Sequence, residues 1–115
     1  MPLIMYGIPN CDTVKKARTW LDANGAGYAF HDYKKQGAHP AKLQQWVAQA
    51  GWETVLNRRG TTFRALPEEQ KADLDADKAI ALMAAHPSCI KRPVVEHPGG
   101  VLVGFDPKAW EQVLL

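Results

Sequence analysis

Residues 3–21 read LIMYGIPNCDTVKKARTWL, and this stretch decides the fold. Leu3–Gly7 is an apolar run followed by Ile-Pro-Asn, which predicts a strand and then a loop. A helix pattern follows the loop, because small and apolar residues recur there at helical spacing: Val14, Ala17 and Leu21. Asn24-Gly25 predicts the end of this helix.

The middle of the chain changes from strand to helix patterns. Tyr28–Tyr33 alternates and predicts a second strand. Pro40 fits the first position of a helix that Gly51 ends, with an apolar stripe of Leu43, Trp46, Val47 and Ala50. Further expected features are a helical turn through Val55-Leu56, a polar loop over 57–60, one or two turns within Pro67–Leu74, and a helix capped by Asp75 or Asp77 and running to Ala85.

The last third returns to strands. Pro93–Glu96 and Val101–Val103, separated by turn residues, predict a β-hairpin. Asp106-Pro107 predicts the start of a final helix, with Trp110, Val113 and Leu114 on its apolar face. The order βαβ…ββα predicts a thioredoxin-like α/β fold with a mixed four-stranded sheet, although other α/β folds share that order.

Composition limits the function classes. The 115 residues are 46% hydrophobic and 23% charged, which predicts one globular domain over 1–115. The net charge of +2 is scattered, so we expect no nucleic-acid partner. No apolar run approaches the roughly 20 residues that span a bilayer, so we expect no membrane partner and a cytoplasmic location.

Cys11 is the candidate catalytic residue. It lies where the first strand hands over to the first helix, and helix-start amides with the helix dipole favour a negative charge there. The thiolate is the nucleophile in thiol–disulfide exchange. Lys15, one turn later, adds positive charge as a candidate anion contact. A buried packing cysteine is the alternative, which the polar neighbours of Cys11 disfavour.

No second thiol follows at the spacing of a Cys-x-x-Cys motif, because position 14 is Val. Cys11 would therefore act as a monothiol resolved by an external thiol such as glutathione, or by a distant partner. Cys89 is the candidate resolving thiol, and burial is its alternative role. The four histidines show no metal-ligand spacing, so we expect no metal and no bound cofactor. Trp46 and Trp110 are expected in the core.

Three segments together resemble the ArsC/Spx family. They are Tyr6–Thr13 with the helix after it, Asn57–Arg64, and Ile90–Val94; Leu102–Phe105 points further to the YffB-like branch. The resemblance runs essentially end to end. It implies a thioredoxin-like domain with a helical insertion at about 36–85.

The resemblance also implies roles for individual residues. Cys11 falls on the family's nucleophile, and Arg92 and Arg59 fall on arginines that hold an oxyanion in the arsenate reductases. Arg58 takes the place of Arg59 if the alignment shifts by one. Guanidinium groups suit that role because they bind oxyanions and carboxylates bidentately. Pro93 fits the cis-proline that thioredoxin-like folds place opposite the cysteine.

The activity expected from this resemblance is glutathione-dependent reduction of a small oxidised thiol, with glutathione as co-substrate. Glutaredoxin-coupled arsenate reduction is one alternative. A third arginine expected before the last helix is absent, and Asp106, which would repel an oxyanion, lies there. The other alternative is a non-enzymatic, Spx-like protein that contacts the RNA polymerase α subunit. Gly51 matches a glycine of that surface and equally fits a helix end.

Overall fold

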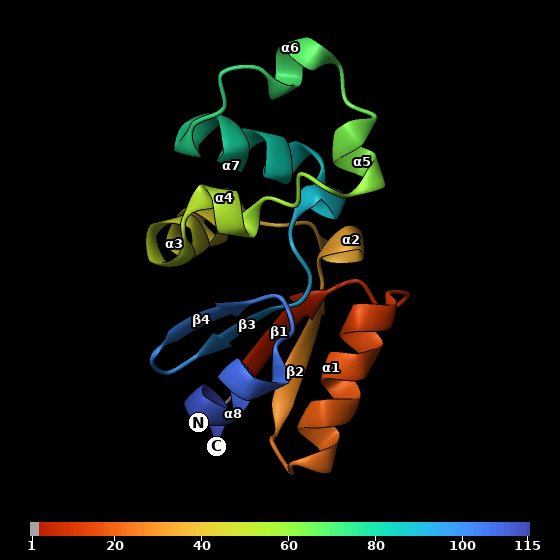
Figure 1. Ribbon diagram of the computed structural model, residues 1–115, viewed down its shortest axis with the longest axis vertical. Coiled ribbons are helices and arrows are strands. Elements are labelled where there is room, and N and C mark those ends of the chain that lie inside the picture. The colour runs from red at the N-terminus through yellow and green to blue at the C-terminus, as the bar shows by residue number, and fades with distance from the viewer. Residues whose placement is uncertain (1–2) are drawn as a thin grey trace. The chain divides into compact units, whose positions relative to one another are not determined.

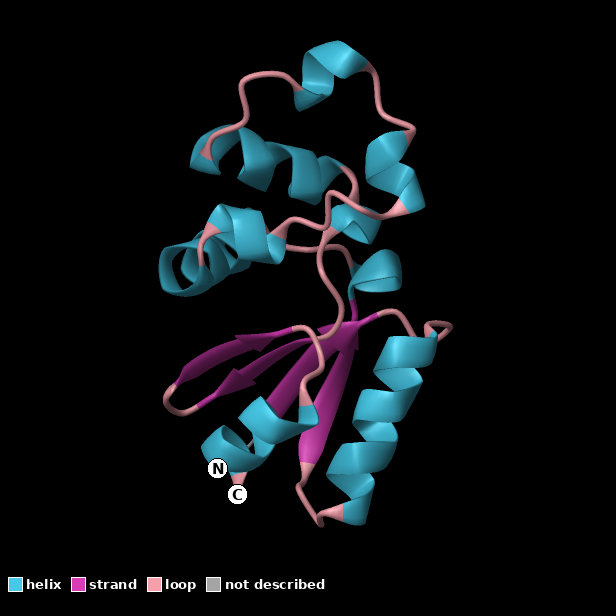
Figure 2. Ribbon diagram, in the orientation of Figure 1, coloured by secondary structure: helices cyan, strands magenta, loops and turns pink. Residues whose placement is uncertain are grey.

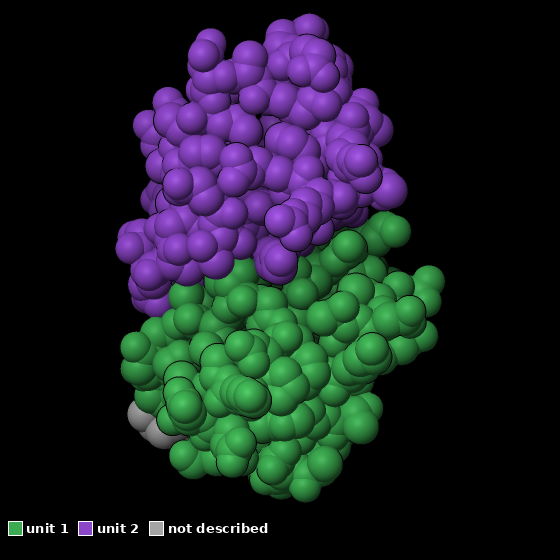
Figure 3. Space-filling model, viewed as in Figure 1, with its two compact units in different colours: residues 1–36, 92–115 green, residues 37–91 purple. Residues whose placement is uncertain are grey.

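The computed structural model describes residues 3–115, which form two compact units. Unit 1 contains the chain up to Gln36 together with Arg92–Leu115, and unit 2 contains Gly37–Lys91 (Figure 3). Unit 1 is thus assembled from two separate stretches of the chain, whereas unit 2 is one continuous segment.

Unit 1 is built on a four-stranded sheet with strand order β2-β1-β3-β4. The strands are β1 (Leu3–Gly7), β2 (Tyr28–Asp32), β3 (Val94–His97) and β4 (Gly100–Val103). β1 pairs in parallel with β2, whereas β1 with β3 and β3 with β4 are antiparallel. This mixed sheet confirms the predicted thioredoxin-like arrangement (Figures 1 and 2).

Two long helices and one short one complete unit 1: α1 (Asp12–Ala23), α2 (Tyr33–Gln36) and α8 (Pro107–Leu114). α1 ends at Ala23 with Asn24 as its C-cap, and Gly25 follows with φ 67°, a left-handed conformation that suits glycine. α8 begins after Asp106, whose carboxylate accepts a hydrogen bond of 3.1 Å from the Lys108 amide. The predicted strand to Tyr33 is one residue too long, because the fully buried Tyr33 already begins α2.

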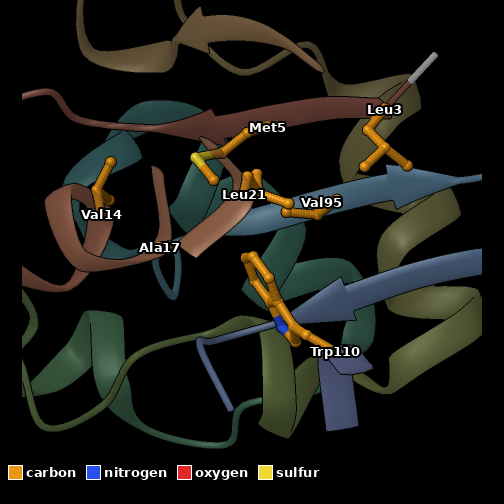
Figure 4. Packing of buried hydrophobic residues seen from close by; sticks show 7 residues of the cluster. All are labelled: Leu3, Met5, Val14, Ala17, Leu21, Val95 and Trp110. Atoms are coloured by element: carbon orange, nitrogen blue, oxygen red, sulfur yellow. The ribbon is translucent and has the colours of Figure 1, made fainter. Parts of the chain in front are cut away.

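The core of unit 1 lies on the sheet face that carries Leu3, Met5 and Val95. Strand alternation brings these side chains to one face, and α1 and α8 bury them (Figure 4). The core residues are Leu3, Met5, Val14, Ala17, Leu21, Val95 and Trp110. Trp110 also packs edge-on against the Trp20 and Phe105 rings, at centroid distances of 5.7 and 4.9 Å. Val113, expected on the apolar face of α8, is instead 47% exposed.

Unit 2 is helical in the part of the chain that the structure describes. Its helices are α3 (Pro40–Ala50), α4 (Trp52–Val55), α5 (Thr61–Arg64), α6 (Glu68–Lys71), α7 (Ala76–Ala85) and the 3-10 helix η1 (Pro87–Cys89). α3 packs against α4 and α7. Asp75 is the predicted cap of α7: its carboxylate accepts the Lys78 amide at 2.8 Å. Leu43 and Trp46 of α3 are buried as expected.

Several local features of unit 2 differ from the sequence-based expectation. Leu56, expected in a helical turn, forms a β-bridge with Ile90, so the backbone is extended there. The unit extends past Ala85 to Lys91, beyond the helical segment expected at 36–85. In this unit, α5 and η1 are single short turns, which leave little periodicity in the sequence.

Candidate functional site

Cys11 lies at the N-cap of α1, as the sequence predicts. Its backbone is extended (φ −134°, ψ 127°), and its carbonyl accepts the Lys15 amide at 2.9 Å. The side chain makes no capping hydrogen bond, so the first-turn amides are not used by this sulfur. The residue is half-buried against the core of unit 1 and is a free cysteine. This position combines the positive end of a three-turn helix with partial access to solvent.

The loop before Cys11 is held by close packing between the first strand and the first helix. A Cβ built on Gly7 would lie 3.0 Å from Val14 Cγ2. Val14 is fully buried, so its side chain has little freedom to move away. Gly7 therefore allows α1 to pack closely against the end of β1. This packing fixes the position of the start of α1, where Cys11 lies.

The peptide bond between Arg92 and Pro93 is cis, as predicted. Pro93 is buried just before β3, and its carbonyl accepts the Gly104 amide at 2.8 Å. Tyr6 pairs with Val94, so Pro93 lies at the end of the sheet where β1 finishes and the Cys11 loop begins. Arg92 is half-buried at the same edge. The sheet register thus places the start of the Cys11 loop, the cis-proline and Arg92 at the same edge of the sheet.

Lys15 is exposed one turn into α1, so it adds a solvated positive charge near the Cys11 loop, and its role as an anion contact stays a prediction. Asp106, at the position of the missing third arginine, caps α8 as expected. Its helix also begins at the β1-end of the sheet, because Val103, the last residue of β4, pairs with Val94. This edge of the sheet therefore carries a carboxylate, whereas a positively charged side chain would be expected there if the protein bound the arsenate oxyanion.

Arg58 and Arg59 lie in unit 2, in the loop before α5, and both are exposed. The Arg58 guanidinium lies 5.5 Å from the centroid of the Trp52 ring. The Arg59 amide donates to Asn57 Oδ1 at 3.1 Å, and the Asn57 amide donates to the Cys89 carbonyl at 2.7 Å. The loop is therefore anchored by its backbone to η1, while Arg58 already has a partner in its own unit.

Cys89 lies in η1 with its sulfur as a thiol, and it is only 1% exposed. Its amide donates to the His86 carbonyl at 2.9 Å, which fixes the turn around it. Cys89 is therefore buried in this structure, and its role as a resolving thiol stays a prediction.

Sequence reasoning missed a polar pair beside the site. The Tyr6 hydroxyl donates to Glu96 Oε1 at 2.9 Å, and the Tyr6 ring lies 4.9 Å from the His31 ring. Burial raises the pKa of Tyr6, and the hydrogen bond and charge of Glu96 raise this pKa further. Strand alternation could have indicated the pair, because Tyr6 and Ile4 share a face and Ile4 pairs with Glu96.

Two negative findings concern only residues 3–115. Among them, no group of three His, Cys, Asp or Glu side chains is placed to hold a metal ion. In that same range, no helix combines the length and the apolar character needed to cross a membrane.

Known proteins resemble this chain along nearly its whole length. The model of the ArsC family matches residues 6–113. A solved structure named YFFB is 58% identical, with a TM-score of 0.96 over 98% of this chain and 99% of that one. An uncharacterized protein of Haemophilus influenzae is 40% identical over 109 residues, which are 95% of this chain and 96% of the relative.

A more distant relative carries a regulatory name. The global transcriptional regulator Spx of Lactiplantibacillus plantarum is 23% identical over 106 residues, which are 90% of this chain and 80% of the relative. The family match extends from β1 to α8 and includes Cys11, the arginine loop and the cis-proline segment. The chain belongs to the ArsC family.

Proposed function

We propose that the protein is a thiol–disulfide reductase that uses Cys11 as its nucleophile and glutathione as co-substrate. The supporting observation is the situation of Cys11: a half-buried free thiol at a helix N-cap, without a capping bond of its own, at the sheet edge that holds Arg92 and cis-Pro93. Family membership supports the same role.

The reaction has two exchange steps. The Cys11 thiolate attacks the glutathionyl sulfur of a mixed disulfide; the substrate's S–S bond breaks, Cys11 and glutathione become joined by a disulfide, and the substrate leaves as its thiolate. A second glutathione thiolate then attacks the glutathionyl sulfur on Cys11. This step releases oxidised glutathione and restores the Cys11 thiolate, so the two electrons come from two glutathione molecules.

Arg92 is the proposed contact for a glutathione carboxylate, because its guanidinium group can bind that group bidentately. Arg59 is proposed as a second anion contact because Arg58 is engaged with Trp52. Arg92 lies in unit 1 and Arg59 in unit 2, so the proposed role of Arg59 is supported by the family motif alone.

The buried Val14 supports a monothiol mechanism over a redox switch. A Cys-x-x-Cys switch would need its second sulfur at position 14, where a fully buried valine belongs to the core. Gly51 adopts φ 88° at the end of α3, a conformation that favours glycine whether or not a partner binds there. A role like that of Spx therefore keeps its support only from relatives that carry that name.

The direct test is turnover of a glutathionylated peptide in the presence of reduced glutathione, followed by release of the peptide thiol. The proposal expects turnover by the wild-type protein and by Cys89→Ser, and none above the uncatalysed rate by Cys11→Ser. Turnover of arsenate without turnover of the glutathionylated peptide would contradict it and favour arsenate as the substrate.

A further inference from the structure

The short helix α2 brings two lysines to the Cys11 edge of the sheet. β2 runs parallel to β1, and Gly7 pairs with Asp32, so the two strands end at the same edge. Lys34 and Lys35 follow Asp32 after the single residue Tyr33, and their helix contacts both β1 and β2 (Figure 1). Cys11 lies four positions beyond Gly7 on the neighbouring strand. The segments that carry the lysines and the cysteine therefore leave the sheet at the same edge.

The backbone of these lysines is fixed while their side chains are exposed. Asp32 Oδ1 accepts the amides of Lys34 and Lys35 at 3.0 and 3.3 Å. Tyr33, which lies between Asp32 and Lys34, is fully buried and anchors the turn. Within the described range 3–115, no carboxylate forms an ion pair with either lysine side chain. Their two charges are thus held at this edge and directed into solvent.

Cations outnumber carboxylates around this edge in unit 1. The positively charged residues there are Lys15, Lys34, Lys35, Arg92 and Lys108. The negatively charged residues are Asp12, Asp32 and Asp106. Asp32 and Asp106 already accept backbone amides, which reduces their availability to a ligand. A local excess of one sign raises the encounter rate of ligands of the opposite sign.

We propose that Lys34 and Lys35 are specificity-determining residues that make Cys11 react preferentially with disulfides carrying carboxylates. This inference rests on the proposed role of Cys11 as nucleophile. The preference acts on the encounter of the disulfide with the thiolate, whereas the exchange step itself is unchanged. The sulfur of Cys11 forms a new S–S bond with one substrate sulfur, and the other substrate sulfur leaves as a thiolate.

Two aromatic disulfides of different charge test this preference. The probes are 5,5′-dithiobis(2-nitrobenzoate), which carries two carboxylates, and 4,4′-dithiodipyridine, which is neutral. Both release a coloured thiolate or thione, so stopped-flow absorbance gives the rate for each. The Cys11→Ser variant supplies the background from the buried Cys89.

The variant Lys34→Gln with Lys35→Gln removes both charges and keeps long polar side chains. We expect its rate with the anionic probe to fall by about three- to tenfold at low salt, and its rate with the neutral probe to stay within about twofold. Lys34→Arg with Lys35→Arg should restore the anionic rate. Added salt should reduce the difference between variant and wild type.

A charge-matched control changes the far end of α1 and α8. Ala23→Glu with Gln112→Glu lowers the net charge by the same amount at exposed positions. Ala23 lies about 18 Å from Cys11 along the helix, beyond a Debye length at about 0.1 M salt. We expect this control to keep the wild-type rate with both probes.

Each other outcome is decisive. An unchanged anionic rate in the Gln variant, an equal loss with both probes, or the same loss in the far-end control overturns the inference while leaving the role of Cys11 intact. If the wild-type protein reacts with the neutral probe no faster than Cys11→Ser does, the proposed function fails, and this inference fails with it.

Discussion

The Tyr6 hydroxyl donates a hydrogen bond of 2.9 Å to Glu96 Oε1 across the β1–β3 ladder. β1 ends at the next residue, Gly7, and the loop that leads to Cys11 begins there. Tyr6 is 6% exposed. Burial first, and then the hydrogen bond and charge of Glu96, raise the pKa of Tyr6 above its ordinary value. The Tyr6 hydroxyl can donate this hydrogen bond between β1, which leads to the Cys11 loop, and β3, which follows Pro93, only while the phenol keeps its proton.

The first prediction concerns stability in alkali. The pKa of Tyr6 is higher in the folded state than in the unfolded chain, so the unfolded state loses this proton first. The stabilisation is complete below the unfolded pKa of about 10 and falls by up to about 1.4 kcal/mol per pH unit above it. Tyr6→Phe should remove this part of the decline, measured as the free energy of unfolding in urea on both sides of about pH 10.

Glu96→Gln is the control for that prediction. It keeps a hydrogen-bond acceptor and removes the charge, so the alkaline decline should be smaller than in the wild type but still present, because burial is the largest cause of the shift. An identical decline in wild type and Tyr6→Phe would show that this pair does not govern stability there.

The second prediction tests the close approach of β1 and α1. Gly7→Ala places a Cβ at 3.0 Å from the fixed Val14 side chain, and we expect a loss of about 1–3 kcal/mol of unfolding free energy. Gly27→Ala is the matched control, since no atom lies within 4 Å of its Cβ, and we expect no loss. Chemical denaturation measures both.

A double variant shows whether Val14 is the cause. Val14→Ala alone leaves a cavity, but it also frees space for the new methyl group at position 7. The combined loss in Gly7→Ala with Val14→Ala should therefore be smaller than the sum of the two single losses. Additive losses would mean that Gly7 is required for another reason.

The third prediction concerns Arg92. A charged hydrogen bond to a carboxylate contributes roughly 1.5–3 kcal/mol, so Arg92→Ala should raise KM for a glutathionylated peptide by about 10- to 100-fold. Arg92→Lys should recover only part of the loss, because an ammonium group lacks the planar fork. An unchanged KM in both variants would remove Arg92 from substrate binding.

The fourth prediction separates Arg59 from Arg58. Arg58 contacts the Trp52 ring, so Arg58→Ala should cost about 0.5–1 kcal/mol of stability and leave KM unchanged. Arg59→Ala should leave stability unchanged and raise KM by about tenfold or more. The reverse pattern in denaturation and steady-state kinetics would assign the anion contact to Arg58.

Sequence reasoning predicted the features that leave long or chemically specific patterns. Around Cys11, the spacing of apolar residues changes from a strand pattern to a helix pattern within residues 3–21. Asp75 and Asp106 are common types of helix N-cap, so they could be recognised from the sequence. The cis bond at Pro93 came from family resemblance, because periodicity carries no signal for it.

The missed features depend on contacts between distant residues or on very short elements. α2 is a single turn whose key residue, Tyr33, looks like the end of an alternating strand until its burial is known. Val113 fits an apolar helix face by spacing, yet the core is filled by Trp110, so the helix does not bury it. Tyr6 and Glu96 are far apart in sequence, and only the strand register joins them.

The most direct test of the account is to identify which sulfur carries glutathione during the reaction. The protein is mixed with a glutathionylated peptide without reduced glutathione, quenched with acid, digested and analysed by mass spectrometry. The account predicts one glutathionyl group on Cys11, none on Cys89, and release of the peptide thiol in equal amount. A glutathionyl group on Cys89 alone, or peptide thiol released at the same rate by Cys11→Ser, would contradict it.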